Sequence, residues 1–248
     1  MDLVKLMTVD AWLPPNTDSL ARIAARTSAL MKSLATIDPL FRDFFTAIVP
    51  APPIPVPLDE PSLARTIYEF GRLGGVRDPV GQSRYYFGAS TMPEPKGPLP
   101  TRMNIEMLVG APKANRVWIQ TDTDIEPDPR LTRYDVVKKM LFALADAFAP
   151  RFSYASPGSL DRDLIVPDGK ASPLFTGWMA LVPQDLAKHI KPPPAAISQT
   201  RPDGSLFMAA TDETFDTANP SHIAVSKAMQ AAITPINDWS LFKPTAST

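Results

Sequence analysis

The sequence predicts an α+β fold, a single domain over residues 1–248 in which helices pack on a mixed, largely antiparallel sheet. Two observations predict this class. Segments with period-two alternation of apolar residues, typical of half-buried strands, are interleaved with segments of 3.6-residue periodicity, typical of amphipathic helices. No linker rich in Gly and Ser separates two units, and no period of 20–50 residues repeats, which excludes a solenoid.

The N-terminal segments predict a strand followed by a helix. Apolar residues alternate loosely over Leu3–Val9, and this strand runs on to Trp12. The helix that follows ends near Asp38, because Pro39 disfavours a helical conformation in the residue before it. Three residues can cap its N-terminus: Asn16, Thr17 and Asp18. Its apolar face consists of Leu20, Ile23, Ala24, Thr27, Leu30, Met31 and Leu34.

Pro50–Pro61 holds six prolines in twelve residues. Proline has no backbone donor and a fixed φ, so this segment is an extended, stiff connector. It is either a ligand for a proline-recognising domain or a rigid surface loop, and the lack of a flanking basic residue favours the loop. A second helix follows over Ser62–Arg72.

The middle of the chain predicts three strands and a helix. Arg84–Ala89 reads as a strand, and Met103–Val109 with Val117–Thr121 forms the clearest hairpin. The next helix begins at a capping pair and ends at Pro150. The capping pair is Thr132 with Asp135. The apolar face of this helix consists of Val137, Met140, Leu141, Leu144 and Phe148.

The C-terminal part predicts further strands and a last helix. Leu174–Val182 is an almost continuous apolar run that suits a strand buried on both faces, with Trp178 in the core. Asp203-Gly204 is a turn signal between two strands, and Asn219-Pro220 begins a helix that runs to about Ile233. The remaining strands are Phe152–Ala155, Ile197–Thr200 and Leu206–Ala209.

Composition excludes several classes of function. The chain has 25 basic and 26 acidic residues, whereas a general nucleic-acid binder shows a basic excess. With no cysteine, it forms no disulfide, thiolate zinc site or cysteine nucleophile. Met1–Thr8 does not resemble a secretory signal, and no apolar stretch approaches the roughly 20 residues that span a bilayer. We therefore expect a cytoplasmic protein without membrane contact.

No catalytic motif is complete. Ser83 and Ser90 lack the second glycine of a nucleophile elbow, and Leu164 stands where a phosphate loop needs its first glycine. His189 and His222 have no second ligand at helical spacing, so each is interpreted as a surface or helix-end residue. The sequence therefore predicts no catalytic residue, no cofactor and no metal site.

Four carboxylates alternate through the segment after the predicted hairpin: Asp122, Asp124, Glu126 and Asp128. A calcium loop would need glycine and glutamate where Pro127 and Arg133 stand, so the metal reading fails. Two interpretations stay open. The segment is either a solvated acidic loop or a patch that contacts a basic partner.

Several segments, in order along nearly the whole chain, resemble the polymorphic-toxin immunity protein family fifty-two: Asp10–Trp12, Leu20–Leu34, Ile37–Phe41, Phe175–Met179, Asp203–Leu206, Phe215-Asp216 and Asn219–His222. The resemblance implies a non-enzymatic immunity protein that binds and blocks a cognate toxin encoded by a neighbouring gene. It also implies a nuclease-type toxin whose active site this protein occludes, without touching nucleic acid itself. The resemblance does not predict the oligomeric state. The alternatives are a structural or adaptor subunit of a secretion or phage-like assembly, and a small enzyme with an unrecognised site.

Overall fold

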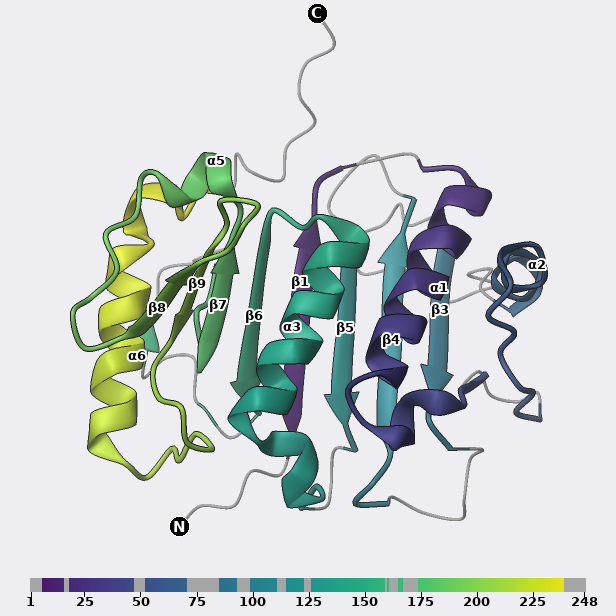
Figure 1. Cartoon of the computed structure of the whole chain (residues 1–248), viewed down its shortest axis with the longest axis horizontal. Helices are drawn as coiled ribbons and strands as arrows, with labels where there is room; N and C mark the ends of the chain where they lie inside the picture. Colours follow the sequence, from purple (N-terminus) through teal and green to yellow (C-terminus); the bar gives the residue numbers. More distant parts are fainter. Residues whose placement is uncertain are drawn as a thin grey trace, which may run out of the picture.

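A computed structural model describes residues 6–15, 18–46, 52–70, 85–92, 99–110, 115–122, 126–158, 160, 165–166 and 174–238. Nine strands of these residues form one antiparallel sheet in the order β2-β3-β4-β5-β1-β6-β7-β9-β8 (Figure 1). This confirms the predicted α+β class. The strands are β1 Met7–Leu13, β2 Phe45–Thr46, β3 Tyr85–Ser90, β4 Met103–Val109, β5 Asn115–Thr121, β6 Phe152–Pro157, β7 Met179–Val182, β8 Ile197–Thr200 and β9 Leu206–Ala209.

The central strands have one face toward the helices and one away from them. β1 lies between β5 and β6, and Ala11 is in register with Val117, which is in register with Met107 of β4. Met107 Sδ lies 3.5 Å from the hydroxyl of Thr27 in α1. The strand residues Ala11, Val117 and Met107 therefore lie on the helix-covered face of the sheet. Side chains alternate along a strand, so Asp10 and its neighbours in register point to the opposite face.

Two helices cross the front of the sheet in Figure 1, α1 (Leu20–Ala35) and α3 (Tyr134–Phe148). Six of the seven residues of the predicted apolar face of α1 are buried, and Ser28 is buried in addition, whereas Leu20 is only partly buried. Its N-cap is Ser19, whose hydroxyl accepts a hydrogen bond from the Arg22 amide at 3.3 Å. The prediction of Asp18 as the cap was wrong, because Asp18 instead pairs with Arg22 and Arg26. The other two predicted caps, Asn16 and Thr17, lie outside the described residues.

α3 begins at Tyr134, with Arg133 as its N-cap residue, whereas the sequence predicted Thr132 as the cap. Thr132 belongs to a preceding 3₁₀ helix, Pro129–Thr132, where its hydroxyl donates to the Pro129 carbonyl at 3.3 Å. Asp135 forms an ion pair with Arg133, the N-cap residue, which makes no side-chain capping bond. The predicted capping box was wrong because both side chains have other partners. The helix ends with Ala149 at φ 48°, just before Pro150.

The proline-rich connector is partly visible and has a structural role. Val56 donates its amide to the Phe44 carbonyl at 2.8 Å, and Thr46 donates to the Ile54 carbonyl at 2.9 Å. The segment around Pro55 thus lies beside β2, at one edge of the sheet. A short 3₁₀ helix, Pro39–Arg42, precedes β2, and α2 (Glu60–Phe70) follows the connector.

The C-terminal third confirms the predicted hairpin and corrects one strand. β8 and β9 have the predicted bounds. The apolar run at 174–182 is a strand only over its last four residues, because Gly177 at φ 55° breaks the extended chain before β7. Trp178 is fully buried, as predicted, and its Nε1–H donates to the Thr211 carbonyl at 3.0 Å.

Two helices complete this end of the molecule, α5 (Gln184–Ala187) and α6 (Pro220–Ala232). Asn219 caps α6 as predicted, accepting from the Ser221 amide at 2.9 Å, and a 3₁₀ turn at Thr234–Ile236 follows. α6 and α2 lie at opposite ends of the sheet (Figure 1). No helix in the described part of the chain is long and apolar enough to cross a membrane.

Candidate functional site

The predicted acidic segment is not a cluster of free charges. Asp122 is 7% exposed at the end of β5. Its carboxylate lies 2.7 Å from Arg102 Nε and accepts the Leu99 amide at 2.9 Å. These contacts attach the loop before β4 to the end of β5, so a structural role accounts for Asp122.

Asp128 also has partners within the chain. Its carboxylate accepts the backbone amide of Arg130 at 2.9 Å and Arg130 Nε at 3.1 Å, which caps the 3₁₀ helix at Pro129–Thr132. These bonds favour the charged form and hold the pKa of Asp128 below its ordinary value. Glu126 is exposed, and Asp124 lies outside the described residues. A partner-binding role for the segment stays a prediction.

The two histidines do not form a site. His189 is exposed, whereas His222 is 7% exposed in the first turn of α6. His222 Nδ1 accepts the Asp216 amide at 3.0 Å, and its ring lies 5.4 Å from that of Phe215. His222 is therefore a buried structural residue at a helix end rather than a surface one. No group of three or more His, Cys, Asp or Glu that could hold a metal occurs among the described residues.

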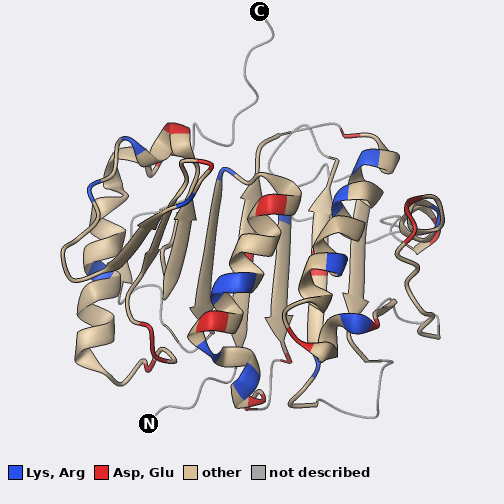
Figure 2. Ribbon diagram, viewed as in Figure 1, with Lys and Arg blue, Asp and Glu red and all other residues tan. Residues whose placement is uncertain are grey.

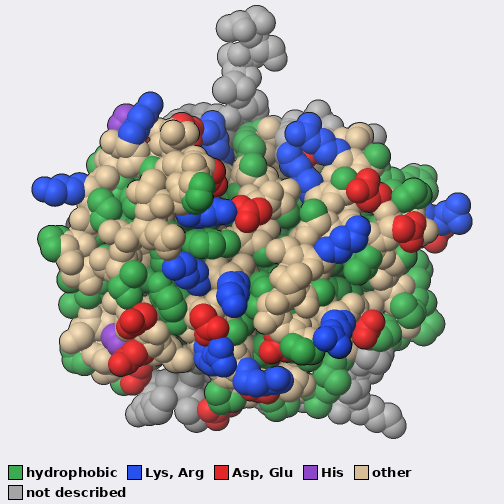
Figure 3. All heavy atoms as spheres, viewed as in Figure 1, with side chains coloured by type: hydrophobic (Ala, Val, Ile, Leu, Met, Phe, Trp, Pro, Cys, Tyr) green, Lys and Arg blue, Asp and Glu red, His purple; other side chains and the backbone are tan. Residues whose placement is uncertain are grey.

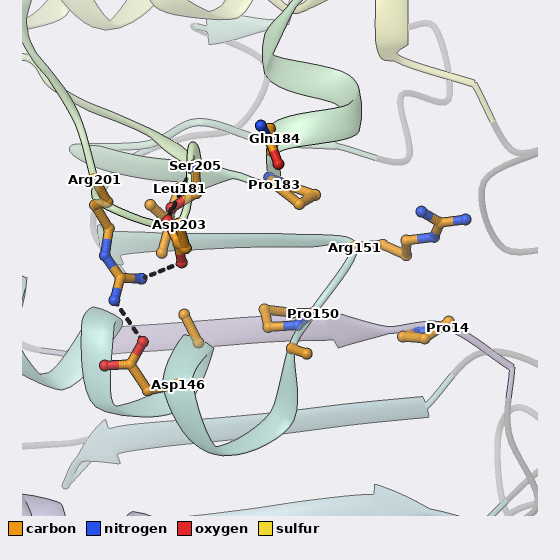
Figure 4. A pocket seen from close by; sticks show the side chains of 12 residues that line it. Pro14, Asp146, Pro150, Arg151, Leu181, Pro183, Gln184, Arg201, Asp203 and Ser205 are labelled. Atoms are coloured by element: carbon orange, nitrogen blue, oxygen red, sulfur yellow. Dashed lines mark hydrogen bonds and ion pairs between the residues drawn. The ribbon is translucent and has the colours of Figure 1, made fainter.

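A cavity of about 540 Å³ opens where the end of α3 meets the start of β6, the end of β7 and the β8–β9 turn (Figure 4). One part of its lining is apolar, and the other is polar and charged. The lining residues are Pro14, Ala145, Ala149, Pro150, Leu181 and Pro183, with Asp146, Arg151, Gln184, Arg201, Asp203 and Ser205.

Arg201 organises the charged side of this cavity. Its guanidinium reaches Asp146 at 2.5 Å and Asp203 at 3.5 Å, as the dashed lines in Figure 4 show. It also lies 4.5 Å from the centre of the Phe142 ring, a cation–π distance. Ser205 donates its hydroxyl and its amide to Asp203 at 2.6 and 3.0 Å, and these bonds lower the pKa of Asp203.

The rim of the cavity is more acidic than its formal charge suggests. The side chains of Asp146 and Asp203 are 62% and 55% exposed, whereas Arg201 is only 12% exposed. Arg151 points away from Arg201 in Figure 4 and pairs with Asp185 at 2.8 Å. A group that approaches this rim therefore meets carboxylates before it meets the guanidinium of Arg201.

The described lining of the cavity contains no serine–histidine pair of the kind that nucleophilic hydrolases use. Ser205 donates to Asp203, and no histidine lines the cavity to act as its base. Its mixed lining suits a protruding side chain of a partner instead. The residues of this site come from separate segments of the sequence, which is why it was not predicted, and only the turn signal Asp203-Gly204 marked part of it.

A second polar cluster lies on the sheet face away from α1 and α3. Asp10 is fully buried there, and Arg116 Nε donates to both of its carboxylate oxygens at 3.0 Å. The guanidinium lies 5.3 and 4.7 Å from the ring centres of Trp12 and Trp118. Burial disfavours the charged guanidinium, but the hydrogen bonds and charge of Asp10 prevail and raise the pKa of Arg116.

The front face shows no extended surface of one charge sign. Basic and acidic side chains are interspersed with hydrophobic ones over α1 and α3 (Figures 2 and 3). Surfaces that hold a nucleic-acid backbone concentrate Lys and Arg instead. The front face therefore offers no surface of that kind.

The chain belongs to the Immunity protein 52 family, whose profile matches residues 9–243. This confirms the resemblance seen in the sequence and makes the chain a member of an immunity protein family. It is also similar in fold to a solved Pseudomonas aeruginosa T6SS protein, PA0821, at 10% sequence identity and a TM-score of 0.54. That similarity covers 92% of this chain and 76% of the other. No curated protein sequence matches the chain.

Proposed function

We propose that this protein neutralises one cognate toxin by binding it stoichiometrically and covering its active site. The match of the immunity-protein profile to residues 9–243 is the observation that carries the proposal. The lack of an assembled catalytic group in the described residues supports inhibition by binding rather than by chemistry. A stable complex of this kind buries about 1,600 Å² in total.

The toxin is a nuclease-type effector in this proposal. A surface that binds a phosphate backbone is basic, and an inhibitor of such a surface benefits from exposed carboxylates. The cavity rim offers these through Asp146 and Asp203, whose side chains are more than half exposed. The apolar part of the cavity would hold the methylene groups of a lysine or arginine from the toxin.

The inhibitor acts in the cytoplasm, where the nucleic acid of the producing cell must be protected. The toxin is encoded by a neighbouring gene, so that a cell acquires both together. In this arrangement the protein itself contacts neither nucleic acid nor a membrane, and the near balance of 25 basic and 26 acidic residues supports this.

Co-expression tests the proposal. The neighbouring open reading frame is induced alone, with this protein, or with this protein after an early stop codon. We expect growth to stop in the first and third strains and to continue in the second. The two chains should then co-purify in a fixed ratio, and this protein should suppress nucleic-acid cleavage in a purified assay. A toxin that kills equally with and without this protein would contradict the proposal.

A further inference from the structure

The two edges of the sheet are treated differently. At the β2 edge, the segment around Pro55 lies alongside the strand and takes up backbone groups of Phe44 and Thr46. Proline cannot donate a ladder hydrogen bond, so Pro53, Pro55 and Pro57 make this segment a poor template for further pairing. The chain thus covers this edge with its own proline-rich connector.

The β8 edge has free backbone groups. Arg201 donates its amide to the Ser205 carbonyl at 2.8 Å, which fixes the alternation of hydrogen-bonded pairs in the β8–β9 hairpin. Gln199 then directs its backbone toward β9, and Ser198 and Thr200 direct theirs outward. In the described part of the chain no hydrogen bond takes up these outward amides and carbonyls, and both residues are exposed.

β8 lacks most of the devices that protect an edge strand. Its four residues, Ile197–Thr200, include no proline and no charged residue, and they pair with β9 without a bulge. Its conformation is held on both sides. Lys138 of α3 donates to the Gln199 side chain at 2.9 Å, and Arg201 links the end of the strand to Asp146. The edge is therefore open and preorganised.

We propose that β8 receives an extended segment of the toxin as an added strand of the sheet. This rests on the proposed function and names the surface that the toxin uses. The added segment needs free backbone groups opposite Ser198 and Thr200, and its amides and carbonyls supply the affinity, as in other strand-addition complexes. A rigid edge loses little conformational entropy on binding, which favours such pairing.

A second copy of this chain is a poorer occupant for the same edge. Two four-residue strands, each pairing through four outward backbone groups, make an interface far smaller than the roughly 1,600 Å² of a specific complex. A toxin that reaches the cavity rim at Asp146 and Asp203 would add contacts beside the strand, because the β8–β9 turn carries Asp203. The edge strand and the cavity would then belong to one interface.

Proline substitution tests the proposal, because it removes one outward donor and leaves the inward bonds of Gln199 in place. Thr200→Pro and Ser198→Pro should each weaken toxin binding at least about tenfold. Each variant loses one hydrogen bond to the added strand, and the proline ring occupies the space that the strand would approach. The matched controls, Thr200→Ala and Ser198→Ala, keep the amide and should bind within about twofold of wild type. Calorimetric titration with inactive toxin measures binding, and thermal unfolding checks each fold.

Amide hydrogen exchange of the wild-type complex gives a second measurement that needs no substitution. The amides of Ser198 and Thr200 should exchange rapidly in the free protein and become protected when toxin binds. Unchanged exchange at both amides, or proline variants that bind like wild type, would overturn the added strand. A dimer of the free protein that the proline variants abolish would also overturn it in favour of self-pairing. Failure of wild type to bind any toxin would instead refute the proposed function.

Discussion

Arg116 on β5 donates hydrogen bonds to both carboxylate oxygens of the fully buried Asp10 on β1. Tyr154 on β6 adds a third donor, its hydroxyl, at 3.1 Å. A buried carboxylate is costly unless charges and hydrogen bonds compensate it, and here the two strands beside β1 supply both. The pair therefore ties the middle of the sheet together on the face that α1 and α3 do not cover.

Replacing Arg116 by alanine should destabilise the protein strongly. Asp10 would remain buried without its charge partner, and breaking a buried pair in this way costs about 3–5 kcal/mol. Urea unfolding followed by circular dichroism measures the loss. The control is Arg133→Ala, which removes an exposed ion pair with Asp135 and should change the unfolding midpoint little. Equal midpoints for the two variants would show that the buried pair contributes no special stability.

Replacing Trp178 by alanine should cost roughly 3–5 kcal/mol through lost burial and the cavity left behind. The side chain is fully buried and lies within 6.4 Å of Phe215 and 6.5 Å of Tyr134, measured between ring centres. Thermal unfolding should show a large drop in midpoint, and protection against the toxin should fail at growth temperature. A variant that stays fully folded yet loses toxin binding would show that Trp178 contacts the partner.

The regular elements could be predicted because their signals are local. The alternation in Met103–Val109, the Asp203-Gly204 turn and the Asn219 cap all lie within a few residues of the structure that they determine. The predicted helix N-termini were wrong where more than one nearby residue could serve as the cap. Ser19 capped α1 in place of Asp18, and the side chains of Thr132 and Asp135 bonded the Pro129 carbonyl and Arg133 rather than each other's backbone amides.

The sites could not be predicted, because distant segments create them. Asp10 and Arg116 lie 106 residues apart, and Asp146 and Arg201 lie 55 apart. The pairing of β1 with β5, and the packing of α3 beside the β8–β9 hairpin, bring each pair together. Neither pairing follows from residue spacing. The open edge of β8 depends on strand order in the same way, and the extent of one domain over residues 1–248 stays a prediction.

Replacing Asp203 by alanine should reduce stability at neutral pH by less than about 1 kcal/mol, because the side chain is largely exposed. Hydrogen bonds from Ser205 lower the pKa of Asp203 from its ordinary 3.8, so folding favours the charged form. This contribution is therefore present above pH 3.8 and is lost as the pH falls through the lower folded-state pKa. Urea unfolding at pH 7 and in steps below pH 4 should show the difference between wild type and variant shrinking. A difference that grows on acidification would contradict this sign.

The acidic segment at residues 122–128 has a structural role that stability measures and a proposed partner-binding role that association kinetics measure. Asp122→Asn should lower stability, because it weakens the buried ion pair with Arg102 and the bond from the Leu99 amide. Glu126→Gln should leave stability unchanged, since this side chain is exposed. If the segment faces a basic toxin, Glu126→Gln should instead slow association by about twofold at low salt, and Asp124→Asn should add to this effect.

Stopped-flow association at two salt concentrations measures the second role. Charges on the rim of an interface steer encounter more than they hold the complex, so the dissociation rate should change less than the association rate. Screening acts over about 8 Å at physiological salt, so the difference from wild type should fade as salt increases. Replacing all four carboxylates, Asp122, Asp124, Glu126 and Asp128, with their amides should give the largest slowing. Equal association rates for wild type and the quadruple variant at low salt would make the segment a solvated loop with structural roles for Asp122 and Asp128 alone.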